Sequence, residues 1–197
     1  GPVLGSNGLL IVASAVGCGS RTYPAATTVL TTPFLNTGVL QNGSNSFLFI
    51  SSVTPITANT DYDTDDNGTL ESLPAGATIV DGVSWTDGGA GDVVYGTVLT
   101  ATSGTIGAAT RFPVNTTPNS AFAWYAGALV GAPEATTYSS TARTANFPTD
   151  GVLTPGAVNS GTITSSAFTA YLSSAQEVPV NASTATGSHC DPECSRR

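Results

Sequence analysis

The chain consists of short apolar runs that are separated by clusters of turn-forming residues. Each run has about the length of one strand, and the clusters are rich in Gly, Asn, Asp, Pro and Ser. The runs that predict strands are residues 8–13, 27–32, 46–53, 77–85, 93–100, 121–130, 136–142 and 161–174. Only residues 121–130 could form either a strand or a helix, because no other run has the periodicity of an amphipathic helix. The pattern predicts an all-β, immunoglobulin-like β-sandwich.

The composition favours strands and argues against several classes of partner. Charged residues make up 9% of the chain, against ~25% in ordinary soluble domains, and all five basic residues are Arg. The net charge of −8 opposes binding to nucleic acid and docking on anionic lipid, because both partners are negatively charged. No apolar run approaches the ~20 residues of a membrane-spanning helix, so we expect no direct membrane insertion. The acidic, Lys-free and Thr-rich composition predicts an extracellular or cell-surface location.

Pro and Gly near residues 154–161 mark a change in composition along the chain. We expect a β-sandwich in residues 1–160 and a C-terminal extension in residues 161–197, with one strand and a tail that contains cysteines. The chain begins without Met, which predicts a processed product or an internal piece of a longer protein.

The segment Asp61–Glu71, with the sequence DYDTDDNGTLE, is the most acidic stretch of the chain. Counted from Asp63, it matches the first half of a calcium-binding loop, with oxygen ligands at positions 1, 3 and 5 and a Gly at position 6. Position 12 holds Pro74 where such loops have a bidentate Glu, so another carboxylate would have to close the site. The predicted ligands of a possible Ca²⁺ ion are Asp61, Asp63, Asp65, Asn67, Thr69 and Glu71, with Asp66 as a further substitute for the missing Glu.

The alternative to a calcium site is a solvated acidic β-turn, in which Asp and Asn side chains bond their own backbone two residues on. Four aspartates within six residues repel one another, and a bound cation would remove that repulsion. The sequence leaves both interpretations open.

The chain has three cysteines, Cys18, Cys190 and Cys194, so one thiol stays unpaired if the other two form a disulfide. In an extracellular chain we expect a disulfide from Cys18 to Cys190 or Cys194. The competing interpretation is a zinc site, because His189 precedes Cys190 and these groups provide three soft ligands. Four sequons make Asn42, Asn67, Asn115 and Asn181 candidates for glycosylation, although chance produces such triplets in a chain rich in Asn, Ser and Thr.

No arrangement typical of an enzyme is evident, so we predict a non-catalytic protein. The single histidine, His189, lies in an irregular tail, whereas a nucleophile needs a base that a third group holds in place. Asp81 and Asp87 flank Trp85, but along a strand they would lie roughly 20 Å apart, beyond the range of paired glycosidase carboxylates. Arg111 is expected to pair with a turn carboxylate. Trp85, Trp124 and Tyr125 could stack on glycans, although a sandwich usually buries such side chains.

Four blocks of the chain resemble the lamin-tail-like modules of secreted bacterial proteins. These blocks are NSFLFI, TDYDTDDNGTLESLPAGATIVDGVSWTDGGAGDVVYG, ATRFPVNTTPNSAFAWY and LTPGAVNSG, and their order extends the resemblance over residues 8–160. The resemblance implies a non-catalytic, immunoglobulin-like sandwich of a kind that often accompanies secreted nuclease or phosphatase domains. A shorter stretch, FTAYLSSAQEVPVNASTATG, resembles the opening of a chordin-type (CHRD) domain.

The chain departs from the lamin-tail-like pattern at its N-terminal side, where it lacks one or two strands of the family. The resemblance therefore implies an incomplete sandwich with an open edge, and an open edge is a template for an added strand. We predict an extracellular structural or adhesive module that self-associates by strand exchange, as a filament or surface-layer subunit. In this arrangement Ser165–Ser174, or the segment before residue 8, would pair with a neighbouring copy. The alternatives are pairing of that strand within its own chain and an accessory module of a larger secreted nuclease or phosphatase.

Overall fold

The computed structural model describes residues 3–14, 21–32, 43–131 and 135–162. The chain divides into two units, Gly1–Thr162 and Ile163–Arg197, and the second unit lies outside the described residues. Several predicted features also lie outside them, namely Cys18, Asn42, Asn181, His189, Cys190, Cys194 and the predicted strand beyond residue 162.

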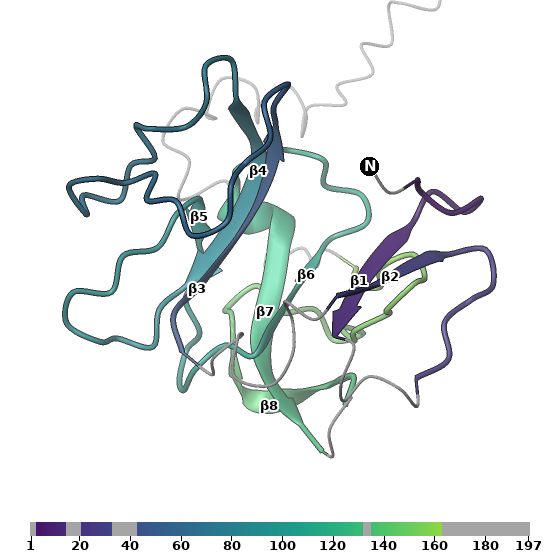
Figure 1. Ribbon diagram of the computed structural model, residues 1–197. Helices are drawn as coiled ribbons and strands as arrows, with labels where there is room; N and C mark the ends of the chain where they lie inside the picture. Colours follow the sequence, from purple (N-terminus) through teal and green to yellow (C-terminus); the bar gives the residue numbers. More distant parts are fainter. Residues whose placement is uncertain (1–2, 15–20, 33–42, 132–134, 163–197) are drawn as a thin grey trace, which may run out of the picture. The chain divides into compact units, whose positions relative to one another are not determined.

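The described residues form an all-β, sandwich-like fold of several small sheets, which confirms the predicted fold class (Figure 1). In the first sheet, β1 (Leu10–Ser14) pairs in parallel with β2 (Thr28–Thr32). In the second sheet, β3 (Asn45–Ser51) pairs antiparallel with β4 (Thr78–Trp85), and β4 pairs in parallel with β5 (Thr97–Val98).

The third sheet is antiparallel and contains β6 (Ala108–Arg111), β7 (Trp124–Val130) and β8 (Thr137–Arg143), with β7 in the centre. A short 3₁₀ helix, η2 (Ala121–Ala123), leads directly into β7. The ambiguous run 121–130 is therefore one 3₁₀ turn followed by a strand.

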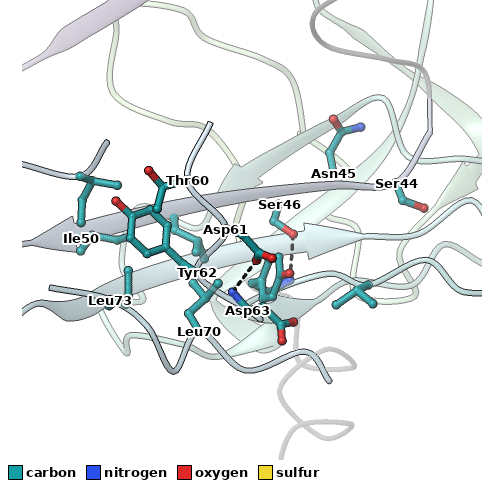
Figure 2. Close-up of a pocket in the computed structure, with 14 residues that line it drawn as sticks. Ser44, Asn45, Ser46, Ile50, Thr60, Asp61, Tyr62, Asp63, Leu70 and Leu73 are labelled. Carbon is teal, nitrogen blue, oxygen red and sulfur yellow. Dashed lines mark hydrogen bonds between the residues drawn. The ribbon is translucent and has the colours of Figure 1, made fainter. Parts of the chain in front are cut away.

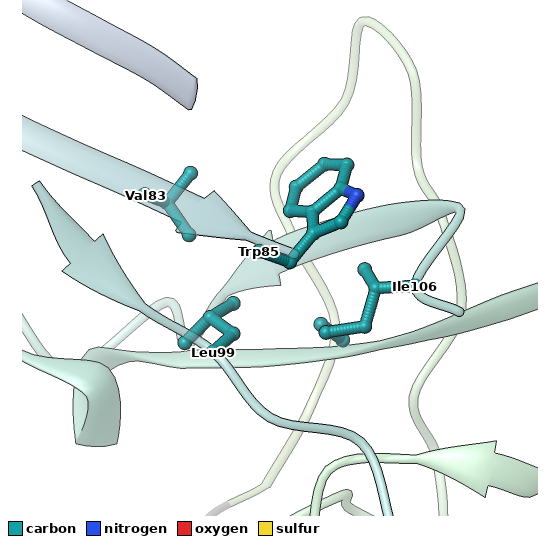
Figure 3. Close-up of a cluster of buried hydrophobic side chains, with 5 residues drawn as sticks. Val83, Trp85, Leu99 and Ile106 are labelled. Carbon is teal, nitrogen blue, oxygen red and sulfur yellow. The ribbon is translucent and has the colours of Figure 1, made fainter. Parts of the chain in front are cut away.

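A cluster of buried side chains joins the second and third sheets (Figure 3). Val83 and Trp85 come from β4, Ala126 comes from β7, and Leu99 and Ile106 come from the connection between β5 and β6. Apolar side chains from both sheets are buried against one another in this cluster, and their burial stabilises the contact between the two sheets.

A second, aromatic cluster lies around the central strand β7. Tyr125 is fully buried, and its ring centroid lies 5.1 Å from those of Phe112 and Phe147 and 5.9 Å from that of Tyr138. The hydroxyl of Tyr138 lies 2.7 Å from the hydroxyl of Thr110, and burial raises the pKa of this phenol above its usual range. The cluster therefore holds tyrosines whose hydroxyls find partners while their rings fill the interior.

One strand prediction needs correction, and one strand was not predicted. The run 93–100 forms a strand only at β5, because Val93, Val94 and Tyr95 precede a turn at Gly96, whose φ of +82° favours glycine. Strand β6 was not predicted, because its short sequence AATR lacks an apolar run and its Arg111 resembles a surface residue. The ion pair described below explains why an arginine stands at the end of this strand.

Candidate metal centre

The acidic segment belongs to the long connection between β3 and β4, and its turn is built from side chain to backbone bonds. Asp61 Oδ1 accepts a hydrogen bond from the N–H of Asp63 (3.1 Å), and Asn67 Oδ1 accepts one from the N–H of Thr69 (2.8 Å). Asp66 and Gly68 have φ angles of +54° and +87°, in the left-handed region that Asp tolerates and Gly adopts freely. The predicted Asx turns are therefore present.

Asp63 is the central residue of this turn, and its residue surface is only 2% exposed. Its Oδ1 accepts a hydrogen bond from the N–H of Asn67 (3.0 Å), and its Oδ2 accepts one from the N–H of Gly68 (2.8 Å). Burial alone would raise the pKa of this carboxyl, but the bonds from Gly68 and Asn67, with a further one from Tyr95, leave its pKa lower than the ordinary value. Asp63 is therefore held as a carboxylate.

Glu71 closes the segment from its other end. Its Oε1 accepts hydrogen bonds from the N–H of Thr64 (2.6 Å) and from the hydroxyl of Thr64 (2.5 Å). The hydroxyl bond is the largest of the effects that lower the pKa of Glu71, while the nearby charge of Asp63 acts in the opposite direction. Glu71 thus comes close enough to Asp63 for the two charges to interact.

Carboxylate oxygens of Asp63, Asp65 and Glu71 all lie within 4.8 Å of one another. Three converging carboxylates suit a hard divalent cation, although Ca²⁺ prefers six to eight oxygens, so backbone carbonyls or water would have to complete its shell. Asp65 and Glu71 are exposed, and exposed acidic groups often converge without an ion. The arrangement is compatible with Ca²⁺ and equally with the solvated turn.

The other predicted ligands have different positions. Asp61 is not part of this group and instead caps the N–H of Asp63, and the side-chain oxygen of Asn67 is engaged by the N–H of Thr69. Asp66 also lies outside the group. Glu71 is the carboxylate that the structure brings next to Asp63 and Asp65, among the three candidates considered for the missing position 12.

An open pocket of about 550 Å³ separates the acidic segment from β3 (Figure 2). Leu48, Ile50 and Leu70 contribute its apolar wall, and Tyr62 and Tyr95 are its aromatic residues. The hydroxyl of Ser46 on β3 accepts a hydrogen bond from the N–H of Tyr95 (2.8 Å), which connects the part of the wall formed by Tyr95 to β3. This pocket could not be predicted from the sequence, because its walls come from segments that are distant along the chain.

A second polar cluster was also missed, at the turn after β4. The hydroxyls of Ser44 and Thr86 donate hydrogen bonds to Asp92 Oδ2, at 2.5 Å and 3.2 Å. The bond from Ser44 is the largest of the effects that lower the pKa of Asp92, followed by the interaction with Asp87. In the sequence, only the two aspartates of TDGGAGD indicate a polar cluster here. Their contact with Ser44 depends on the pairing of β3 with β4.

Arg111 forms the predicted ion pair, and its partner is Asp81. Asp81 lies on strand β4 rather than in a turn, so the pair connects the second and third sheets. The guanidinium also donates to the carbonyls of Asn115 (3.0 Å) and Thr117 (2.7 Å), and its carbon lies 5.4 Å from the ring centroid of Trp124. Asp81 is thereby committed to a structural contact.

Trp85 and Tyr125 are core residues with almost no exposed surface, so neither presents a ring for stacking on a glycan. Asn67 is exposed, whereas the side-chain N–H of Asn115 donates to the carbonyl of Phe122 (3.2 Å) and that residue is half-buried. Glycosylation at these two sites stays a prediction.

Comparison with family models, curated proteins and solved structures found no match for the chain. The resemblance to lamin-tail-like and CHRD modules therefore stays a prediction. No helix in the described part of the chain has the length and apolar character needed to cross a membrane.

Proposed function

We propose that this chain is an extracellular, non-catalytic structural or adhesive module that assembles with copies of itself by strand addition. A Ca²⁺ ion at Asp63, Asp65 and Glu71 would stiffen the acidic segment of each copy. The observation that carries the proposal is the division of the described fold into small sheets whose outer strands have no further strand beside them in that part of the chain.

The first sheet supports the proposal most directly. It contains only β1 and β2, and exposed apolar side chains occur on both strands, at Val12, Val29 and Leu30. An uncovered strand edge offers a row of backbone donors and acceptors to another chain. An added strand would therefore extend this sheet and connect two copies.

The test of assembly is the state of the purified chain over a wide concentration range, measured by sedimentation velocity and electron microscopy. We expect oligomers or filaments whose size increases with concentration. A monomer at every concentration would contradict self-assembly and would leave the role of an accessory module in a larger secreted enzyme.

The test of calcium binding is thermal unfolding with Ca²⁺ and with a chelator. We expect Ca²⁺ to raise the melting temperature of the native chain, because an ion that binds only the folded state stabilises it. Asp65→Asn should abolish this increase, since Asp65 belongs to the carboxylate group and has an exposed side chain.

Asp66→Asn is the matched control, because Asp66 is the adjacent exposed aspartate, lies outside the group and has a φ that Asn also tolerates. This variant should retain the calcium-dependent increase. An equal response of the two variants, or no response of the native chain, would show that the segment is a solvated turn.

A further inference from the structure

Strand β3 has an open outer edge in the described part of the chain. It is the terminal strand of the sheet β3-β4-β5, and only its inner edge pairs with β4. Its sequence NSFLFIS contains no charged residue and no Pro, which are the usual devices that prevent another strand from adding to an edge. Phe49 is 70% exposed and Phe47 is 42% exposed.

Open pockets lie beside both faces of this strand. Side chains alternate along a strand, so Phe47 and Phe49 share one face and Leu48 and Ile50 share the other. A pocket of about 420 Å³ is lined on the first face by both phenylalanines together with Val83 and Trp124. The 550 Å³ pocket lies on the second face, and Ser46 and Leu48 line both. An added strand with alternating side chains would meet a recess on each side.

The charge distribution indicates which kind of strand fits. The chain carries a net charge of −8, so two copies repel unless they meet at a surface without uncompensated acid. The face of β3 that carries Phe47 and Phe49 is such a surface, because Asp81, the carboxylate opposite Phe49 on the neighbouring strand, is paired with Arg111. Asp61 and Asp63 line the pocket on the opposite face. The edge therefore favours a neutral, apolar partner strand, and β3 itself meets this description.

We propose that β3 pairs with β3 of a second copy, antiparallel and about a two-fold axis that passes next to Leu48. In this register Leu48 lies opposite its own counterpart, and each Phe47 lies opposite a Phe49 on the same face. Antiparallel neighbours in direct opposition are close enough for their side chains to pack, and aromatic pairs are among the favourable combinations. The two β3-β4-β5 sheets become one continuous sheet of six strands. This inference rests on the proposed self-assembly and names one of its contacts.

The first test compares Phe49→Glu with Val130→Glu by sedimentation equilibrium of the full chain. Phe49→Glu places a charge opposite an aromatic ring and between two acidic copies, so it should weaken dimerisation by roughly tenfold or more. Val130 is likewise an exposed apolar residue of a strand, but it lies on β7, and its replacement should leave dimerisation unchanged. Circular dichroism of both variants establishes that they are folded.

The second test uses disulfide formation and does not depend on the stability of a charged variant. Leu48→Cys should form a disulfide between two copies on mild oxidation, because opposed residues in this register lie within the Cα separation that a disulfide allows. Ile50→Cys is the control on the same face. Its two copies would be four residues apart along the strands, about 13 Å, and should not link. Mass spectrometry of the linked peptide separates the new bond from any bond of the natural cysteines.

The outcomes separate this inference from the proposed function. Loss of dimers in Phe49→Glu together with the Leu48→Cys link supports pairing through β3. If the native chain assembles but Phe49→Glu assembles equally well, or Leu48→Cys gives no link, β3 is not the contact, while the proposed self-assembly stands. If the native chain is monomeric at every concentration, both proposals fail.

Discussion

The aromatic cluster around Tyr125 and the open face of β3 have similar chemistry and opposite exposure. Both consist of aromatic side chains on or beside strands, yet Phe112 is 2% exposed and Phe49 is 70% exposed. The difference lies in the segment 144–161, which packs over the first region. Gly151 lies against the rings of Phe147 and Tyr125 with no room for a side chain. In this fold an irregular segment, rather than a further sheet, buries the aromatic residues.

Phe112→Ala and Phe49→Ala should differ most in their effect on the free energy of unfolding. Phe112→Ala should lower the free energy of unfolding by about 3–5 kcal/mol, because it removes a fully buried ring and leaves a cavity. Phe49→Ala should change the stability of the monomer by less than about 1 kcal/mol, since its ring already faces solvent. Urea unfolding at concentrations where the chain is monomeric measures both values. Similar losses for the two variants would contradict the described difference in burial.

The ion pair between Arg111 and Asp81 connects the two regions, so its removal should have an intermediate effect. Arg111→Ala should cost about 2 kcal/mol, because Asp81 then loses its partner and the carbonyls of Asn115 and Thr117 lose their donors. The two side chains are 21% and 20% exposed, so water replaces part of the lost interaction.

Arg111→Lys is the matched control for this prediction. It retains the charge but not the planar fork that reaches two carbonyls and a carboxylate at once, and it should recover only part of the loss. Full recovery in a chemical unfolding measurement would show that charge alone accounts for the contribution.

The smallest effect per residue is expected from three loop carboxylates, through the dependence of stability on pH. The pKa values of Asp63, Glu71 and Asp150 are lower in the folded chain than their ordinary values of 3.8 for Asp and 4.5 for Glu. In the unfolded chain these groups take up protons first as the pH falls, so their contribution to stability is complete above about pH 5. It decreases as the pH falls through the ordinary pKa values and is fully lost only below the lower pKa values of the folded chain. Melting temperatures measured from pH 6 to pH 3 should decrease in that window.

Asp150→Asn tests one member of this set. The N–H and the hydroxyl of Thr162 both donate to Asp150, and the N–H bond is the largest of the effects that lower its pKa. The variant should therefore have a shallower pH dependence than the native chain. A melting temperature that is constant down to pH 3 in the native chain would contradict the whole prediction.

Much of the strand content could be predicted from the sequence, because apolar runs between turns identify β1, β2, β3, β4, β7 and β8 to within a few residues. The pairing could not be predicted. β1 and β2 run parallel, and contacts distant along the chain support this arrangement, such as the bond from the hydroxyl of Thr27 to the carbonyl of Gly156 (2.8 Å). Local patterns contain no information on such a contact.

The candidate metal centre could likewise be predicted only in part from the sequence. Asp63 and Asp65 were identifiable from spacing alone, because their positions match a known loop. The choice of Glu71 as the third carboxylate was not, since it depends on how Thr64 holds that side chain. Asn67 matched the template but uses its side-chain oxygen within the turn, where it caps the N–H of Thr69. A one-dimensional template cannot distinguish these two uses of the same amide.

The bonds around Ser160 and Thr162 have a mechanical consequence. The hydroxyl of Tyr125 lies 3.0 Å from the carbonyl of Ser160, and Asp150 holds Thr162 through two further hydrogen bonds. The chain continues beyond Thr162, so a tensile load applied from that side would reach these contacts before it reached any strand of the sheets. The hydrogen bonds of Asp150 and Tyr125 would therefore break first under force, while the strands of the sheets remain paired.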